Sequence, residues 1–194
     1  MGYDEKIFKA KANIKARRLW LVFAILLTAN YGTDTVNGAY SVSNYIIFVI
    51  LCWLPFVCGD ILLKKKGKDN DRYRLAFVIG YGIFYVFLLC TTTSPIAFTY
   101  ILPIISLIVI FKDEKFMIYC AVANMLSLIA SIAFHIFVLG QNTAIDHKNF
   151  QLQIACLLLC YIGYIMSVRH LTESDAALTE SIKSDLNRVV TTVE

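Results

Sequence analysis

Polar side chains that could hydrogen-bond to a ligand or to another helix recur along one apolar stretch, CAVANMLSLIASIAFHIF (residues 120–137). Cys120 is followed by Asn124, Ser127, Ser131 and His135, at offsets of 4, 7, 11 and 15 residues. At about 100° per residue these positions form one stripe along a helix. Such a stripe is expected to face protein or a cavity, not lipid. Ordinary hydrogen bonds between helices and a small-ligand pocket both explain the stripe.

A second polar group lies near the end of the first apolar stretch. Asn30, Tyr31 and Asp34 fall close together there, and an ionisable residue near membrane depth is a candidate functional residue. The alternative is a carboxylate that lies in water at the membrane interface. We expect Asp34 and His135 to lie near the same membrane surface, where they could form a proton-sensitive or ligand-contacting pair. The predicted pocket comprises Asn30, Tyr31, Asp34, Asn124, Ser127, Ser131 and His135.

Residue patterns of enzymes and of metal sites are missing from the sequence. The three histidines form no HExxH motif, and neither a GxSxG nor a Walker pattern occurs. The six cysteines form no CxxC pair and fall in apolar stretches, where small apolar packing explains them. We therefore expect a protein that is not an enzyme, with no catalytic residue, metal ion or cofactor.

The elements that must place these side chains are helices in a membrane. Hydrophobic residues make up 58% of the 194 residues and charged residues only 16%, a composition outside the range of soluble domains. A helix of about 17 to 25 apolar residues crosses a bilayer. The sequence predicts an all-α integral membrane bundle with six such helices: Leu19–Thr35, Val42–Leu63, Leu75–Cys90, Pro95–Phe111, Phe116–Leu139 and Phe150–Val168.

Charge placement predicts the orientation of these helices. If both termini are cytoplasmic, every one of the 18 Lys and Arg residues except Lys148 falls in a cytoplasmic segment, as the positive-inside rule requires. The net charge of +4 therefore reports topology and contact with lipids, and no nucleic-acid partner is expected. The predicted location is the inner (plasma) membrane of a bacterial cell, which the chain crosses several times.

Three regions are predicted along the chain. Residues 1–18 form a basic cytoplasmic helix on the inner leaflet, or a simple basic flank. Residues 19–168 form the six-helix membrane domain, which we interpret as a sensor. Residues 169–194 begin a cytoplasmic coiled coil, because a narrow apolar stripe recurs there at spacings of 7, 4, 4, 3 and 4. The stripe consists of Leu171, Leu178, Ile182, Leu186, Val189 and Val193.

Two further features favour a homodimer with a continuing output helix. Cys156, Cys160, Gly163 and Ser167 give the last membrane helix a face of small residues, which permits close helix contact. The final VVTTVE contains no Gly, Asn or Pro that would end a helix. We therefore expect the helix to continue into an output domain outside these 194 residues.

The stretch LTESDAALTESIKSDLNRVVTTVE (residues 171–194) resembles the helix by which methyl-accepting chemotaxis transducers leave the membrane. The resemblance implies a homodimer whose full-length cytoplasmic bundle regulates a chemotaxis histidine kinase through a coupling protein. The expected function is a transmembrane sensory receptor, with sensing in the membrane domain and output through the coiled coil. The alternatives are a small transporter or channel, the membrane region of a sensor histidine kinase, and a scaffold without a ligand.

Overall fold

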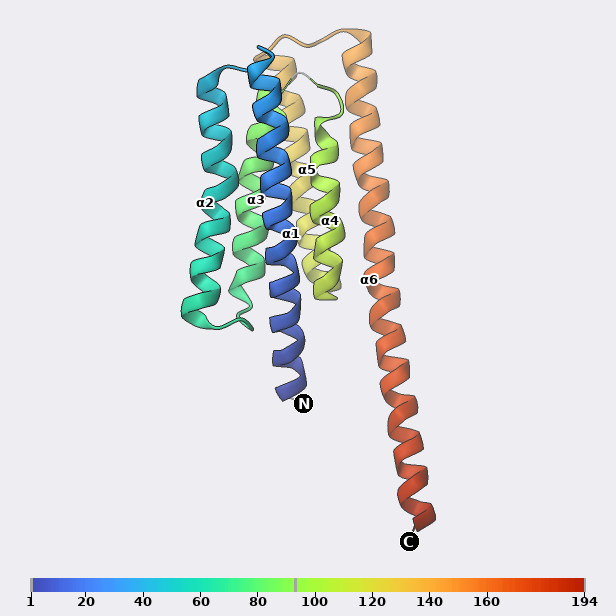
Figure 1. Cartoon of the computed structure of the whole chain (residues 1–194). Helices are drawn as coiled ribbons and strands as arrows, with labels where there is room; N and C mark the ends of the chain where they lie inside the picture. The colour runs from blue at the N-terminus through green and yellow to red at the C-terminus, as the bar shows by residue number, and fades with distance from the viewer. Residues whose placement is uncertain (1, 93, 194) are drawn as a thin grey trace.

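The computed structural model describes residues 2–92 and 94–193, and this part of the chain consists of helices and their connections, without a strand (Figure 1). The predicted all-α class is therefore confirmed. Five of the helices, α1, α2, α3, α5 and α6, are long and apolar enough to cross a membrane, and α4 belongs to a shorter apolar segment. The elements are α1 Gly2–Val36, α2 Val42–Lys66, α3 Arg72–Thr91, η1 Ala97–Ile101, α4 Leu102–Ile108, η2 Val109–Phe111, α5 Glu114–Phe137 and α6 Ala144–Val193.

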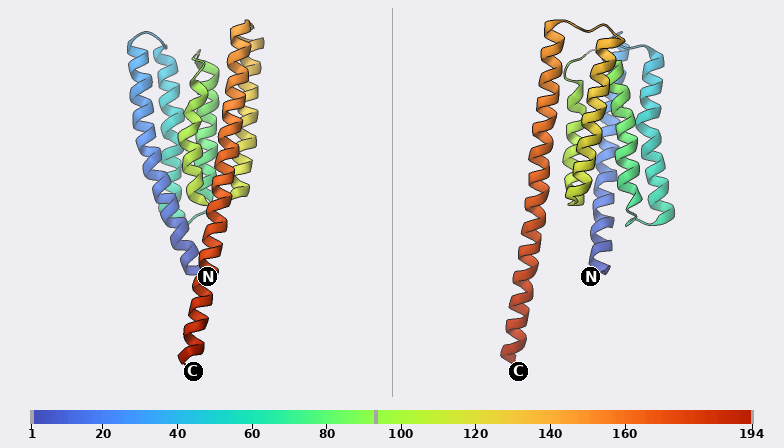
Figure 2. Two further views of the ribbon diagram at one scale, coloured as in Figure 1. Left: turned by 90° about the vertical axis from the view of Figure 1, so that its right-hand side faces the viewer. Right: turned by 180° about the vertical axis from the view of Figure 1, so that it is seen from behind.

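Consecutive helices run in opposite directions, so their connections gather at two ends of the bundle (Figures 1 and 2). We call the end with the α1–α2, α3–η1 and α5–α6 connections the distal end. The other end, with the α2–α3 and η2–α5 connections, is the exit end, because α6 continues past it and beyond the N-terminus (Figure 2). Neither α1 nor α6 is broken at the predicted region boundaries near residues 18 and 169.

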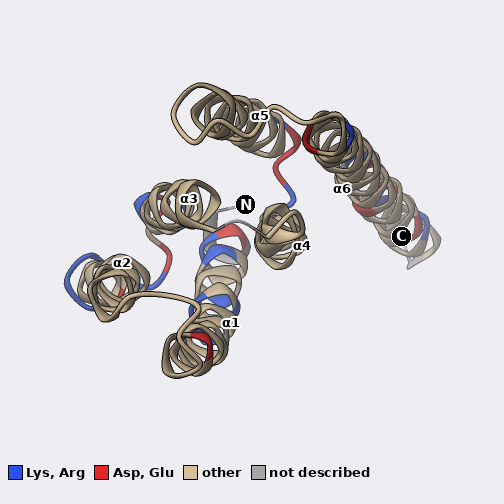
Figure 3. Ribbon diagram, turned by 90° about the horizontal axis from the view of Figure 1, so that it is seen from above, with Lys and Arg blue, Asp and Glu red and all other residues tan. Residues whose placement is uncertain are grey.

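The segment around α4 is the most deeply packed part of the bundle. The predicted fourth span, Pro95–Phe111, is observed as Ala97–Phe111, with 3-10 turns on both sides of a short α-helix. Pro103 lies in the first turn of α4, where its missing N–H costs no helical hydrogen bond. Viewed from the distal end, α4 lies among α1, α3 and α6 (Figure 3). Its buried side chains, with those of η1, are Ala97, Phe98, Ile101, Ile104, Ile105, Leu107 and Ile108.

Aromatic packing and one close backbone approach join the first three helices. Trp20 of α1 is buried and makes an edge contact with Phe77 of α3, with ring centroids 4.8 Å apart. Gly80 lies so close to Pro55 of α2 that an added Cβ would overlap the proline ring. Glycine at position 80 is therefore what lets α2 and α3 pack at this distance.

We predict that Gly80→Ala destabilises the bundle by about 1 to 3 kcal/mol, the usual cost of overpacking. The matched control is Gly82→Ala on the same helix, because an added Cβ there meets nothing within 4 Å. This control is expected to leave stability unchanged or raise it slightly, since Ala favours a helix. Thermal unfolding of the two purified variants in detergent compares them, and equal midpoints would contradict the proposed contact.

Candidate functional site

The predicted polar stripe on α5 lies against protein along most of its length. Asn124, Ser131 and His135 are buried, as is Cys120, while Ser127 is half-buried. The Asn124 amide donates a hydrogen bond to the Tyr161 hydroxyl of α6. The Ser127 hydroxyl donates to the carbonyl of Ala123 in its own helix, at 2.9 Å. Hydrogen bonds between helices and within one helix therefore account for the polar side chains in this middle part of the stripe.

At the distal end the stripe reaches a small polar cavity of about 80 Å³, which we call the His135 cavity. His135 Nε2 lies 2.7 Å from the carbonyl of Leu89, and Nδ1 lies 2.9 Å from the side-chain oxygen of Gln141. Both partners are oxygens that only accept, so Nε2 donates to the Leu89 carbonyl, and Nδ1 of the neutral ring accepts from the Gln141 amide when that amide is turned to present its NH2 group. Gln153 donates to the carbonyl of Pro95 at 3.0 Å. A volume of about 80 Å³ has room for a few water molecules and lies well below the usual range for organic ligands.

The polar residues of α1 line a separate and larger cavity, of about 260 Å³, which we call the Tyr31 cavity. Asp34 lies on its wall, and Asn30 donates to the hydroxyl of Tyr100 at 3.2 Å. Tyr31 stacks between two rings, with Tyr40 at 4.3 Å and Phe48 at 4.1 Å between centroids. The buried Tyr31 hydroxyl has no hydrogen-bond partner among the described residues.

The structure thus divides the predicted single pocket among three places. Asp34 and His135 line different cavities, whose common wall contains Thr92 and Ser94, so the hypothetical pair is not formed. Asn124 and Ser127 line an open groove between α3 and α5. A helix rises about 1.5 Å per residue, so the 11 residues from Asn124 to His135 span roughly 16 Å. One helical face therefore passes several cavities.

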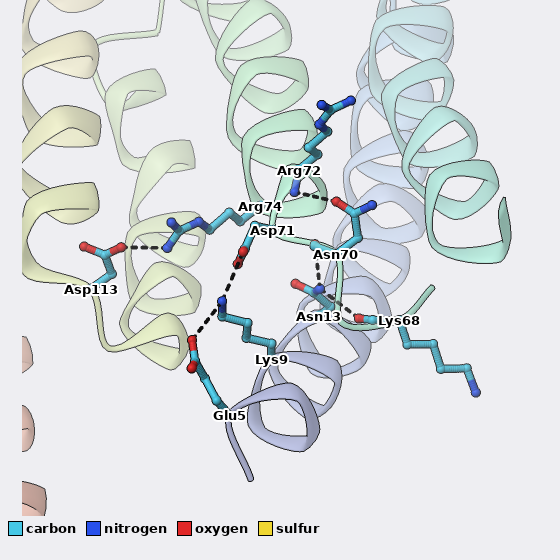
Figure 4. Close-up of polar contacts among 9 residues, drawn as sticks. All are labelled: Glu5, Lys9, Asn13, Lys68, Asn70, Asp71, Arg72, Arg74 and Asp113. Carbon is cyan, nitrogen blue, oxygen red and sulfur yellow. Dashed lines mark hydrogen bonds and ion pairs between the residues drawn. The ribbon is translucent and has the colours of Figure 1, made fainter. Parts of the chain in front are cut away.

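A polar cluster at the exit end was not predicted as a site. Lys9 lies between Glu5 and Asp71, 3.0 Å from each carboxylate (Figure 4). The amide of Asn13 donates to the carbonyls of Lys68 and Asn70, at 2.9 and 3.1 Å (Figure 4). These contacts attach the basic start of α1 to the α2–α3 connection. In the sequence these residues indicated only topology, because their partners other than Glu5 lie more than 50 residues away.

Asp113 organises the connection between η2 and α5. Its carboxylate accepts from the backbone N–H of Phe116 at 2.9 Å, capping α5, and pairs with Arg74 of α3 at 2.7 Å. The Arg74 guanidinium also lies over the Phe116 ring, 4.8 Å from its centroid. Burial by itself raises the pKa of Asp113, but the Phe116 N–H and Arg74 outweigh it and hold the pKa below the ordinary 3.8.

The same connection contacts α6 where that helix leaves the bundle. Lys112 pairs with Asp175, and Arg169 donates to Glu114 from Nε at 3.0 Å and from its terminal nitrogen at 2.5 Å. Exposed ion pairs contribute little to stability. Their position matters more, because they join residues 112–114 to the first turns of α6 beyond the bundle.

The predicted coiled-coil stripe has no partner within the described chain. All side chains from 169 to 192 are exposed, and that of Val193 lies outside the described residues. The stripe side chains have large exposed fractions: Leu171 38%, Leu178 62%, Ile182 54%, Leu186 61% and Val189 63%.

Comparisons with protein-family models, with curated proteins and with solved structures found no match. The assignment of a function therefore rests on the residues of this chain.

We predict that His135→Leu lowers the stability of the bundle by about 1 to 3 kcal/mol, because the buried Leu89 carbonyl loses a donor. The matched control is His147→Leu, which removes an exposed histidine at the same end. Thermal unfolding in detergent should show a lower midpoint for the first variant only. Equal midpoints would contradict a structural role for the His135 hydrogen bonds.

We also predict an acid-dependent contribution from Asp113. Because its folded-state pKa is lowered, the carboxylate stabilises the protein fully above the ordinary pKa, and this contribution is lost as pH falls through the lowered value. Asp113→Asn keeps a capping oxygen but cannot titrate, so its stability should fall less below pH 3.8 than that of the wild type. The control is Asp69→Asn, which removes a carboxylate of the α2–α3 connection, and a pH profile for Asp113→Asn that equals that of the wild type would contradict the proposed contribution.

Proposed function

We propose that this protein is a transmembrane sensory receptor whose membrane bundle passes a stimulus to a cytoplasmic output through α6. The observation that carries the proposal is the unbroken 50-residue length of α6. At about 1.5 Å per residue the helix is roughly 75 Å long, while a hydrocarbon core is about 30 Å thick. One part of α6 packs in the bundle, and the part from residue 169 is exposed. A continuous helix couples motion in the first part to the second.

We propose six membrane spans, with Ala97–Phe111 as the fourth and both termini in the cytoplasm of a bacterial cell. The 3-10 turns lengthen this short segment, since 3-10 helix rises about 2.0 Å per residue, giving roughly 26 Å in total. The distal end supports the orientation, because Lys148 is the one Lys or Arg there in the described chain. Viewed from that end, the α1–α2 and α5–α6 connections carry no blue residues (Figure 3).

A sequence repeat that runs through both the bundle part and the exposed part of α6 supports a homodimer along this helix. Cys160 is followed by Leu171, Ile182 and Val193 at intervals of 11 residues. A parallel series at the same interval consists of Cys156, Ser167, Leu178 and Val189. An 11-residue repeat corresponds to about 3.67 residues per turn and keeps one face aligned along a nearly straight helix. The small-residue face in the membrane therefore leads into the exposed apolar stripe, and a second copy of α6 would cover both.

The ion pairs of Lys112 and Glu114 with α6 supply a route for the signal. The α4 segment forms walls of both distal cavities, and its opposite end leads directly into this connection. A shift of α4 would therefore pull on α6 at the point where it leaves the bundle. The resemblance of residues 171–194 to chemotaxis transducers supports an output to a chemotaxis histidine kinase through a coupling protein.

We predict that single cysteines at Leu178, Ile182 and Val189 form disulfide-linked dimers in membranes, after the six native cysteines have been replaced. Cysteines at Glu180 and Ser184, on the opposite side of α6, are the matched controls and should crosslink much less. Non-reducing gel electrophoresis after mild oxidation measures the dimer. Equal crosslinking on both sides, or none at any position, would reject the proposed dimer and its output helix.

A further inference from the structure

The Tyr31 cavity contains a carboxylate without a counter-ion. Asp34 is half-buried on the cavity wall, and no ion pair or hydrogen bond to its side chain occurs among the described residues. No Lys, Arg or His lines this cavity. A partly buried charge loses hydration that a cation of the ligand can replace. The electrostatics of the cavity therefore favour a positively charged occupant and disfavour an anion.

Aromatic rings form much of the remaining wall. Tyr31, Tyr40 and Tyr100 all line the cavity. Tyr31 is covered on both faces by Tyr40 and Phe48 and its hydroxyl is fully buried, so only the edge of its ring reaches the cavity. Tyr100 takes part in no ring stack among the described residues, and Tyr40 stacks only on the Tyr31 side. Ring faces without an aromatic partner attract cations, most strongly where water is excluded.

The combination of one carboxylate with tyrosine rings distinguishes among kinds of cation. Calcium and magnesium ions require about six or more oxygen ligands, usually with more than one carboxylate. The described residues contain no group of three or more His, Cys, Asp or Glu side chains that could hold a metal ion. An organic ammonium needs only one opposite charge and tolerates aromatic carbon around it.

We infer that the Tyr31 cavity binds a small organic ammonium ion. Asp34 balances its charge, and the rings of Tyr40 and Tyr100 contact its alkyl or ammonium group. The volume of about 260 Å³ lies below the usual range of about 300 to 1,000 Å³ for drug-sized ligands, so the ligand has few heavy atoms. This inference rests on the proposed sensory function, for which it names the class of stimulus.

One wall of the Tyr31 cavity belongs to the path proposed for the signal. Thr99 and Tyr100 of η1 line the cavity, and the Tyr100 carbonyl accepts from the Tyr81 hydroxyl of α3 at 2.6 Å. An ammonium ion held between α1 and η1 would therefore change the contact between α1 and the α4 segment. Occupancy of the cavity thus acts on the element that continues to Lys112 and Glu114.

Isothermal titration calorimetry of the purified 194-residue chain in lipid nanodiscs tests the inference, with n-butylammonium as the probe. We expect saturable binding that Asp34→Asn weakens at least about tenfold, because a charge-assisted contact is lost. Asp146→Asn is the matched control, since it removes a carboxylate at the same end that does not line the Tyr31 cavity, and it should bind as the wild type does. Tyr31→Phe keeps the ring stack and removes only a buried hydroxyl, so it should bind n-butylammonium as the wild type does.

The neutral isostere 1-butanol should show no saturable binding. The inference is overturned if n-butylammonium does not bind saturably, if 1-butanol binds equally well, or if Asp34→Asn leaves the affinity unchanged. Size-exclusion chromatography and circular dichroism verify that each variant is folded. Binding is measured without any output, so its failure rejects the ligand class alone, whereas absence of α6 crosslinking rejects the proposed receptor dimer alone.

Discussion

Two hydrogen bonds from α3 to the 3-10 turn η1 are the contacts on which the bundle interior depends. Tyr81 donates to the carbonyl of Tyr100 at 2.6 Å, and Tyr85 donates to the carbonyl of Phe98 at 3.0 Å. A 3-10 turn leaves backbone groups without regular helical partners, and inside a membrane no water would satisfy them. The two tyrosines supply those partners, so a short irregular segment can occupy the centre of an otherwise regular helical bundle.

Both distal cavities are built on this irregular segment. The chain from Thr92 to Tyr100 contributes walls to the His135 cavity on one side and to the Tyr31 cavity on the other. The two cavities differ chemically. The smaller one is lined by amides and a histidine whose hydrogen bonds are made, while the larger one is lined by the unpaired carboxylate of Asp34. This unpaired charge distinguishes the larger cavity as the place that we propose for a ligand.

At the exit end, unlike in the Tyr31 cavity, charged side chains form ion pairs with one another. Arg74 with Asp113 and Lys9 with Asp71 connect elements that are distant in sequence (Figure 4), and so does Lys112 with Asp175. The first two pairs hold the connections of the bundle in place. The third reaches α6, the element that projects beyond the bundle. Packing at the distal end and charge at the exit end are therefore linked through α4 and the connection that follows it.

The sequence by itself determined the helical class, the apolar segments, and the inward face of α5. These follow from local composition and from the 3.6-residue period, which any helix with these residues must express. It also indicated the exposed stripe of α6, although not what covers that stripe.

Only the tertiary structure decided which polar residues meet. The sequence pattern predicts that Asp34 and His135 lie at the same membrane depth. In the structure, the chain between α3 and η1 separates them. Arg74 pairs with Asp113, which is 39 residues away in sequence, and Lys112 pairs with Asp175, which is 63 residues away. Periodicity fixes the direction of a side chain from its own helix but carries no information on which helix lies opposite. That neighbour depends on packing details such as the fit of Pro55 against Gly80, which sets how closely two helices approach.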